Sequence, residues 1–353
     1  MRQFKSAVSL LAAAFLAGCG GGGGGDQTPK VQFNSMVSFG DSLSDVGTYS
    51  VGTVKALGGG KYTINSADAK IWIELLASQL KLAAPCAAQT GLNGDPTKGF
   101  SVPVTNAAGC TAYAQGGARV TNPVGPGNKL LGGANATLGQ LTVPIITQIQ
   151  NHLAASGGSF KGNEVVFVLA GGNDILINLA TVSAGGSPTA AVTAAGTAGA
   201  ELAAYVNNLI LAKGAKYVVL VNVPDVSETP LGNAAEAGKA GSKALINTMV
   251  TTFNSQLQSL NGNPNVAYVD AYTVSRDQVS NPAQYGLTNV KDTACDLSPA
   301  KNPLGSSLVC TQANVIPGVV DRYEFADTVH PTPFAHQLLA RYVALELVKK
   351  GWL

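Results

Sequence analysis

The stretch EVVFVLAGGND, Glu164 to Asp174, joins an apolar run to two glycines and two polar residues. A short run that is apolar at every position from Val165 to Ala170 predicts a strand buried on both faces. The glycines that follow predict a turn at the carboxyl end of that strand, where open α/β sheets bind their ligands. The stretch therefore predicts a parallel sheet with a polar site at one edge.

Similar runs occur along the chain and alternate with stretches of helical periodicity. The other predicted strands are SMVSF (35–39), KYVVLVNV (216–223), NVAYVD (265–270) and the shorter TAYA (111–114). The predicted helices cover 68–80, 142–155, 189–213, 244–260 and 333–350. This alternation predicts an α/β fold with three layers, α/β/α, around a central and mostly parallel sheet of five strands.

The composition limits the class of protein. The 353 residues are 46% hydrophobic and only 12% charged, which is typical of a chain that buries a large core. Because residues 33–353 contain no charge run or Pro/Ser-rich linker, we expect them to form one domain. The net charge of +2 is spread over the chain, so nothing favours binding to nucleic acid.

The amino end has the order of parts found in a secretory signal peptide. A basic start with Arg2 and Lys5 precedes an apolar stretch over 7–17 and then LAGC, which ends at Cys19. This ending resembles the lipobox of bacterial lipoproteins, in which Cys19 would carry the lipid and the Gly-rich segment 20–32 would be a flexible tether. We therefore expect a bacterial outer-membrane lipoprotein that faces the periplasm or the cell surface. The alternative is an ordinary signal peptide over 1–19 and a secreted extracellular protein.

Removal of the leader leaves an even number of cysteines for an oxidising compartment. Of the three possible connectivities we favour local pairing, which joins Cys86 to Cys110 and Cys295 to Cys310. The chain has no Cys-x-x-Cys or His-Glu-x-x-His spacing, and its histidines are His152, His330 and His336. We therefore expect no metal site, and we place His152 on a helix surface and His336 inside a helix.

A serine lies just beyond the first predicted strand, in SFGDSLSDVG, Ser38 to Gly47. Ser42 lies two residues after Gly40, and a glycine at that distance suits a tight turn on which the serine hydroxyl is exposed. A serine needs a base and oxyanion donors before it acts as a nucleophile. The elbow pattern G-x-S-x-G is absent, which disfavours an α/β-hydrolase. We expect Asp41 and Asp45 to stabilise the turn.

The base is predicted near the other end, in FADTVHP, where Asp327 and His330 are three residues apart. A carboxylate that orients an imidazole leaves the other ring nitrogen to face the serine. The pair precedes a helix whose predicted cap is Thr332.

Two glycine-rich stretches follow predicted strands and offer donors for an oxyanion. YAQGGAR contains Gly116, Gly117 and Arg119, and LAGGNDI contains Asn173 and Asp174. We expect Arg119 to be solvated and Asp174 to stabilise a turn.

Four blocks in this order, GDSLSD, GGA, GGND and DTVHP, resemble those of the GDSL, or SGNH, family of serine esterases and lipases. The resemblance implies the flavodoxin-like SGNH fold without a cofactor. It implies Ser42 as nucleophile and His330 as base oriented by Asp327, with Gly117 and Asn173 as oxyanion donors. NPAQYGLTNVKDTAC (281–295) further resembles the bacterial branch with autotransporter esterases and haemolysin-like phospholipases and acyltransferases.

We therefore expect a monomeric carboxylic ester hydrolase that acts through an acyl-enzyme on small-molecule or lipid esters. Alternatives are an acyltransferase or phospholipase on envelope or host lipids, and a carbohydrate O-acyl esterase. A further alternative of another class is a surface lipoprotein that uses an inactive hydrolase fold for binding. Against it, all five residues that the family requires are present.

Overall fold

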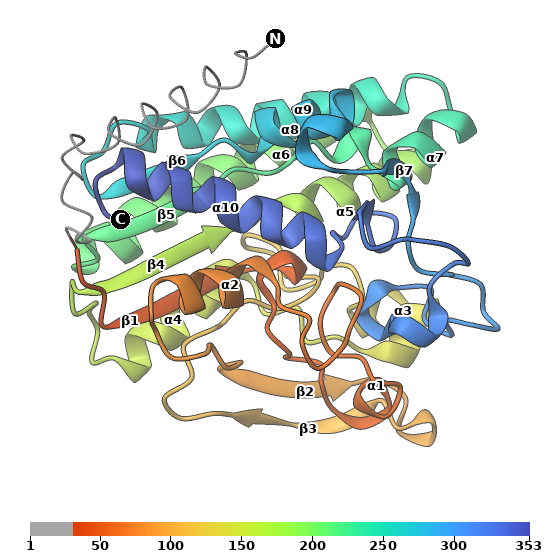
Figure 1. Cartoon of the computed structure of the whole chain (residues 1–353), viewed down its shortest axis with the longest axis horizontal. Helices are drawn as coiled ribbons and strands as arrows, with labels where there is room; N and C mark the ends of the chain where they lie inside the picture. The colour runs from red at the N-terminus through yellow and green to blue at the C-terminus, as the bar shows by residue number, and fades with distance from the viewer. Residues whose placement is uncertain (1–30) are drawn as a thin grey trace, which may run out of the picture.

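Four of the predicted strands form a parallel sheet in the computed structural model, which describes residues 31–353. They pair in the order β1 (Ser35–Gly40), β4 (Glu164–Leu169), β5 (Tyr217–Val221) and β6 (Val266–Val269). All three pairings are parallel and in continuous register. The carboxyl ends of all four strands therefore meet at one edge of the sheet (Figure 1).

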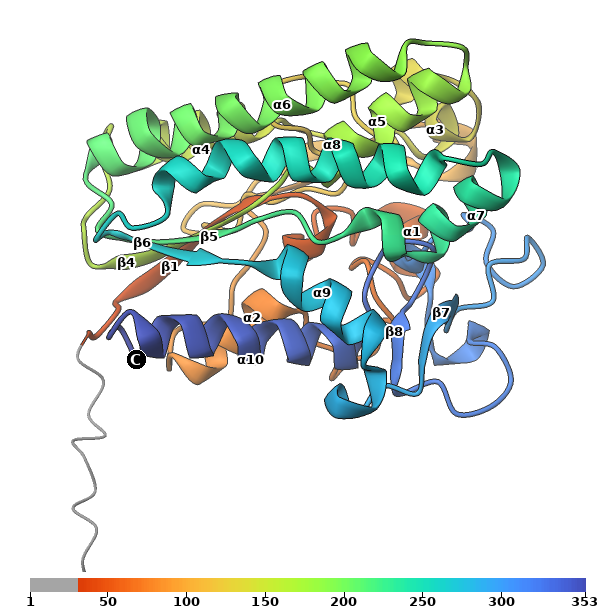
Figure 2. The same ribbon diagram turned by 90° about the horizontal axis from the view of Figure 1, so that it is seen from above.

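Both faces of the sheet are covered by helices, and side chains alternate between the two cores. In β4, Val166 and Val168 pack on one face, whereas Phe167 and Leu169 pack on the other. This alternation explains why the strand is apolar at consecutive positions. Figure 2 shows the resulting layers, with the sheet between two sets of helices.

The helices confirm most of the predicted ones. One face carries α4, α5, α6 and α8, and the other carries α2 and α10. Their bounds, with those of the remaining helices, are α1 (Gly52–Ala56), α2 (Trp72–Gln79), α3 (Gly133–Leu138), α4 (Ile145–Ala155), α5 (Gly172–Ser183), α6 (Pro188–Tyr205), α7 (Pro230–Gly238), α8 (Ser242–Leu257), α9 (Ala271–Ser280) and α10 (Pro333–Lys349). Thr332 caps α10 as predicted, since its hydroxyl accepts a hydrogen bond from the Ala335 N–H at 3.2 Å.

The fifth predicted strand is present only as an irregular edge, so the prediction of five strands is wrong in this detail. Residues 111–114 run parallel to β1 and form one bridge with it, between Ser38 and Ala112, and Ala112 forms a second bridge with Ala87. The Ser38 N–H donates to the Thr111 carbonyl, and the Tyr113 N–H donates to the Ser38 carbonyl. The segment is too short for a regular ladder because the glycine turn follows it at once. Its position nevertheless gives the flavodoxin-like order, with the second segment outside the first.

Two small sheets lie beside the central one, and each is accompanied by a disulfide. β2 (Gln89–Asn93) and β3 (Ser101–Asn106) are antiparallel, and β7 (Asn289–Thr293) and β8 (Tyr323–Phe325) are parallel. The disulfides join Cys86 to Cys110 and Cys295 to Cys310, which confirms the predicted pairing.

The predicted leader over 1–19 lies outside the described residues, as do Cys19 and nearly all of the predicted tether over 20–32. Within residues 31–353, no helix has both the length and the apolar character needed to cross a bilayer.

Candidate active site

Ser42 stands at the carboxyl edge of the sheet, on a short 3₁₀ turn that begins right after β1. The Asp41 carboxylate caps this turn by accepting the Leu43 N–H at 3.1 Å. The backbone of Gly40 lies so close to β4 that a Cβ there would be 2.5 Å from the Leu169 carbonyl oxygen, so the position needs glycine. Gln148 of α4 also binds the Gly40 N–H and carbonyl, both at 2.9 Å. The start of the serine turn is therefore held from two sides.

Ser42, His330 and Asp327 form a continuous hydrogen-bonded relay. The Ser42 Oγ lies 2.8 Å from His330 Nε2. The other ring nitrogen, Nδ1, lies 2.8 Å from each carboxylate oxygen of Asp327. This is the arrangement in which an imidazole accepts the proton of a serine while a carboxylate fixes its tautomer.

The Asp327 carboxylate is buried and fully hydrogen-bonded. Its oxygens accept the N–H groups of Ser307 at 2.7 Å, Val329 at 3.0 Å and His330 at 2.9 Å. Burial opposes ionisation, but the charge and hydrogen bonds of His330, with those backbone donors, hold the pKa of Asp327 well below its usual value. Asp327 therefore remains an acceptor beside the imidazole.

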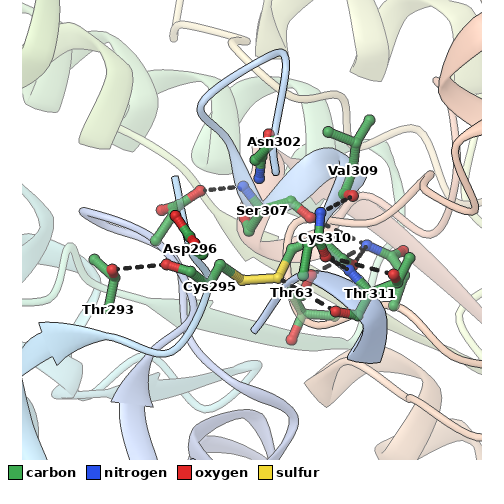
Figure 3. Close-up of a disulfide and its surroundings, with 12 residues drawn as sticks. Thr63, Thr293, Cys295, Asp296, Asn302, Ser307, Val309, Cys310 and Thr311 are labelled. Atoms are coloured by element: carbon green, nitrogen blue, oxygen red, sulfur yellow. Dashed lines mark hydrogen bonds between the residues drawn. A yellow bond between two sulfur atoms is a disulfide. The ribbon is translucent and has the colours of Figure 1, made fainter. Parts of the chain in front are cut away.

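Ser307 is a partner of Asp327 that the sequence did not reveal. It belongs to a short turn that ends at Cys310, and Figure 3 shows it beside the Cys295–Cys310 disulfide. The Cys295 N–H in turn binds the Ala326 carbonyl, next to Asp327. The disulfide thus ties together the two segments that hold the carboxylate.

One further side chain packs against His330, and a second histidine, His336, is buried in α10. The ring of Tyr62 lies against the imidazole, with 4.7 Å between the ring centroids, and the Gln140 amide donates to the Tyr62 hydroxyl. His336 of α10 is fully buried, and burial lowers its pKa to about 3, so it stays neutral. Tyr62 was missed by the sequence reasoning because nothing in its local pattern marks it.

Three residues with free hydrogen-bond donors, Ser42, Gly117 and Asn173, line one cavity. The backbone N–H groups of Ser42 and Gly117 have no acceptor among the described residues, and both residues line the same cavity. Asn173, in the first turn of α5, uses one amide hydrogen for the Ala118 carbonyl at 2.8 Å and also lines the cavity. Its second amide hydrogen has no acceptor among the described residues, and free N–H donors of this kind can stabilise an oxyanion.

The turn at Gly117 requires glycine. Its φ is +76°, and a Cβ would lie 2.1 Å from the Pro126 carbonyl oxygen. Asp45 holds this turn against the serine turn, since its carboxylate accepts the N–H of Gly116 at 2.9 Å as well as those of Gly47 and Thr48. We predicted only a local role for Asp45, whereas it joins two segments of the site.

Arg119 and Asp174 form an ion pair, so the expectation of a solvated arginine is wrong. Arg119 Nε lies 2.9 Å from the Asp174 carboxylate, which also accepts the Val120 N–H at 3.0 Å. Burial raises the pKa of Asp174, and Arg119 opposes that shift. Because Asp174 follows Asn173 in α5, the pair fixes this helix against the Gly117 turn.

His152 is also placed differently from the prediction. It lies on the buried face of α4, among Phe39, Tyr113 and Phe160, whereas we expected it on the exposed face of the helix. Burial lowers its pKa, so it is neutral in the core. The helical pattern of the sequence did not show that this one polar residue lies on the buried face.

Ser42 opens into a cavity of about 330 Å³. Its walls are mainly apolar and include Leu169, Ala271, Val274 and Leu339. Asp41 also lines it, and burial raises the pKa of Asp41 to about 7 despite the Leu43 N–H and His330. Within the described part of the chain, no group of three or more metal-ligating side chains comes together.

Two GDSL esterase/lipases of Arabidopsis thaliana are similar to the chain. One is 28% identical over 141 residues, and the second, EXL6, is 27% identical over 149 residues. The matched regions cover 36% and 38% of this chain and 33% and 39% of the two relatives, so each match spans less than half of either protein.

Among solved structures, the lipase Lip_vut3 from a goat rumen metagenome is 14% identical and has a TM-score of 0.42. The alignment covers 90% of this chain and 98% of that one. A TM-score at this level does not establish a shared fold. The model of the GDSL-like lipase/acylhydrolase family, by contrast, matches residues 36–343, which span the sheet and every residue of the relay. The chain therefore belongs to the GDSL-like lipase/acylhydrolase family.

Proposed function

We propose that this protein is a serine hydrolase that cleaves carboxylic esters through an acyl-enzyme. The observation that carries the proposal is the relay from Ser42 through His330 to Asp327, together with donors on Ser42, Gly117 and Asn173, which line the same cavity. A relay without donors, or donors without a base, would leave the hydroxyl inert at neutral pH. Membership of a family of lipases and acylhydrolases supports the same chemistry.

In the first step, Ser42 Oγ attacks the ester carbonyl carbon while His330 Nε2 takes the serine proton. The carbonyl oxygen gains negative charge and accepts hydrogen bonds from Ser42 N–H, Gly117 N–H and the Asn173 amide. The bond to the leaving alkoxy oxygen then breaks, and His330 returns its proton to that oxygen. An alcohol leaves, and the acyl group stays on Ser42.

In the second step, a water molecule attacks the acyl carbon and His330 takes one of its protons. The same donors stabilise the second oxyanion. The bond to Ser42 Oγ breaks, His330 protonates that oxygen, and a carboxylic acid is released. Asp327 stays ionised throughout, because its hydrogen bonds favour the carboxylate.

Covalent labelling tests the proposal. An organophosphonate should add one phosphonyl group to the native protein, at the peptide that contains Ser42, and Ser42→Ala should abolish the mass increase. Ser44→Ala is the matched control, since the Ser44 hydroxyl has no hydrogen-bond partner among the described residues, and it should still be labelled. A native protein that takes no label and hydrolyses no ester would show that the fold is used only for binding.

The acceptor of the acyl group distinguishes a hydrolase from an acyltransferase. A phospholipase that transfers the acyl group to water is a hydrolase in this sense. We propose water as the acceptor. Product analysis with a phospholipid or simple acyl ester as donor, in the presence of a sterol or sugar alcohol, checks this. Free acid should dominate, and a dominant new ester would contradict the hydrolase assignment. An acetylated polysaccharide in the same panel tests the carbohydrate esterase alternative.

We also propose, from the sequence alone, that Cys19 carries a lipid anchor in a bacterial outer membrane. The support is the order of charged, apolar and small residues before Cys19. Metabolic labelling with a fatty acid should mark the native protein and not Cys19→Ala. Unlabelled native protein found in the medium would favour the secreted alternative.

A further inference from the structure

The cavity that contains Ser42 is not apolar throughout. Its walls include Val274 of α9 and Leu339 of α10, but several polar side chains also line it, among them Glu324 of β8 and Gln278 of α9. Glu324 is only 9% exposed and Gln278 only 6%. Neither residue belongs to the relay or to the set of oxyanion donors.

Glu324 has no partner for its side chain. Neither carboxyl oxygen forms a hydrogen bond or ion pair with any described residue, and Oε2 is completely buried. Its backbone is nevertheless fixed, because the Glu324 carbonyl accepts the Thr332 N–H at 2.9 Å. An unpaired carboxyl inside a protein is costly, so such groups are normally hydrogen-bonded or serve a ligand.

Gln278 also lacks a hydrogen-bond partner, although no polar atom of its side chain is completely buried and unpaired. It lies on a different element, and its side-chain amide forms no hydrogen bond with a described residue, although the neighbouring Ser275 is bonded to the Tyr272 carbonyl at 3.0 Å. A buried carboxyl without a partner, together with a second unpaired polar side chain in the same mainly apolar cavity, indicates that the molecule bound there brings the missing partner.

The chemistry of the two groups selects among possible partners. Burial raises the pKa of Glu324 to about 7. Near neutrality the carboxyl is therefore present both in its protonated form, which can donate a hydrogen bond, and as the carboxylate, which can only accept one. A hydroxyl can pair with either form, and an amide both donates and accepts. An ammonium group could pair only with the carboxylate and would have to lose its hydration in an apolar cavity, which is costly.

We propose that Glu324, with Gln278, selects esters whose chain carries a hydroxyl group. This inference rests on the proposed ester hydrolysis and adds its substrate class. Glu324 is thus a specificity residue: it binds the hydroxyl while Ser42 attacks the ester carbonyl elsewhere in the same cavity. The hydroxyl can belong to the acyl half or to the alcohol half of the ester, since both halves extend from the reacting carbon.

Matched pairs of esters test the proposal. In one arm, para-nitrophenyl esters of hexanoic acid are compared with those of hydroxyhexanoic acids that carry the hydroxyl at successive carbons. In the other arm, hexyl butanoate is compared with the butanoate monoester of hexanediol. For the best position in one arm, the native protein should favour the hydroxylated ester by about tenfold in kcat/KM.

The variants locate this preference. Glu324→Leu should bring the ratio close to one, mainly through a higher KM for the hydroxylated ester, whereas Glu324→Gln should keep part of it. Glu346→Leu on α10 is the matched control outside the cavity and should keep the native ratio. Because both esters are measured on the same preparation, the ratio does not depend on the fraction of folded protein. Gln278→Leu gives a second reading and should also lower the ratio.

A ratio of one or less for every pair in both arms of the native protein would overturn the inference, as would a Glu324→Leu variant with the native ratio. These failures differ from failure of the proposed function. In that case the native protein would take no phosphonate and hydrolyse neither ester of any pair.

Discussion

The Nε2 atom of His330 lies 2.8 Å from the Oγ atom of Ser42, although 288 residues separate the two along the chain. The contact exists because β1 delivers Ser42 to the carboxyl edge of the sheet and the segment before α10 passes the same edge. Tyr62, packed against the imidazole, and the Asp327 carboxylate then determine how the ring is oriented.

Loss of either end of this contact should abolish turnover. We expect Ser42→Ala and His330→Ala each to lower kcat by roughly 10³ to 10⁶. Because the two residues act as a unit, the kcat of the double variant should be no lower than that of the less active single variant. Steady-state kinetics with an activated ester checks this. Additive losses in the double variant would contradict a shared mechanism, and Ser44→Ala should stay close to native.

The Asn173 amide should matter for the rate more than for binding. Asn173→Ala is expected to lower kcat by about 10² to 10³ with little change in KM, since the donor acts mainly on the developing oxyanion. Asn178→Ala is the matched control, because Asn178 lies in the same helix and binds only the Asp174 carbonyl at 2.8 Å. A loss confined to KM would assign Asn173 to substrate binding instead.

The two disulfides should have separable effects. Removal of either pair by double Cys→Ala substitution is expected to cost about 2–4 kcal/mol in the free energy of unfolding, measured with urea. Only loss of Cys295–Cys310 should also lower kcat, because that bond holds the Ser307 turn whose N–H binds Asp327 at 2.7 Å. Loss of Cys86–Cys110 serves as the control. Equal effects on kcat would show that the Ser307 contact does not depend on the nearby disulfide.

Stability should fall as the pH rises through the acidic range. Burial raises the pKa of Glu324 from 4.5 to about 7, so the folded state binds more protons than the unfolded state between these values. The free energy of unfolding contributed by Glu324 is therefore present below pH 4.5 and is lost by about pH 7. Glu324→Gln should remove on the order of 1–3 kcal/mol of this decline. Urea unfolding of both proteins at about pH 5 and about pH 8 measures it.

Asp327 acts in the opposite direction. Its pKa is lowered in the folded state, so its contribution is present above the usual pKa of an aspartate and is lost as the pH falls through the lowered one. If the native protein were equally stable at both pH values, the raised pKa of Glu324 would be contradicted. If Glu324→Gln reproduced the whole native decline, its source would be the other buried carboxyls, with Asp41 first among them.

Much of the fold could be read from local pattern. Strands β4 and β5 are apolar at consecutive positions because both of their faces are buried, and that property is visible without a structure. The short edge segment around Tyr113 is different. Its backbone pairs with Ser38 over only one bridge, so its strand character depends on β1 and not on its own residues.

The same division applies to the site. The order of the blocks around Ser42, Gly117, Asn173 and His330 identified the family and predicted the residues that the structure brings to one cavity. The side chains that hold those blocks together were not predicted. Asp45 was assigned to its own turn, and Arg119 to solvent, whereas each binds a segment more than fifty residues away.

By itself, the sequence determined the alternation of strands and helices, the family, and the residues suited to nucleophile, base and donors. These depend on residue type and short spacing, which a chain carries before it folds. Only the tertiary structure decided which buried polar groups are satisfied and which are not. Ser307 N–H binds Asp327, while the Glu324 carboxyl stays without a partner in the cavity, because such contacts depend on how irregular loops pack against one another.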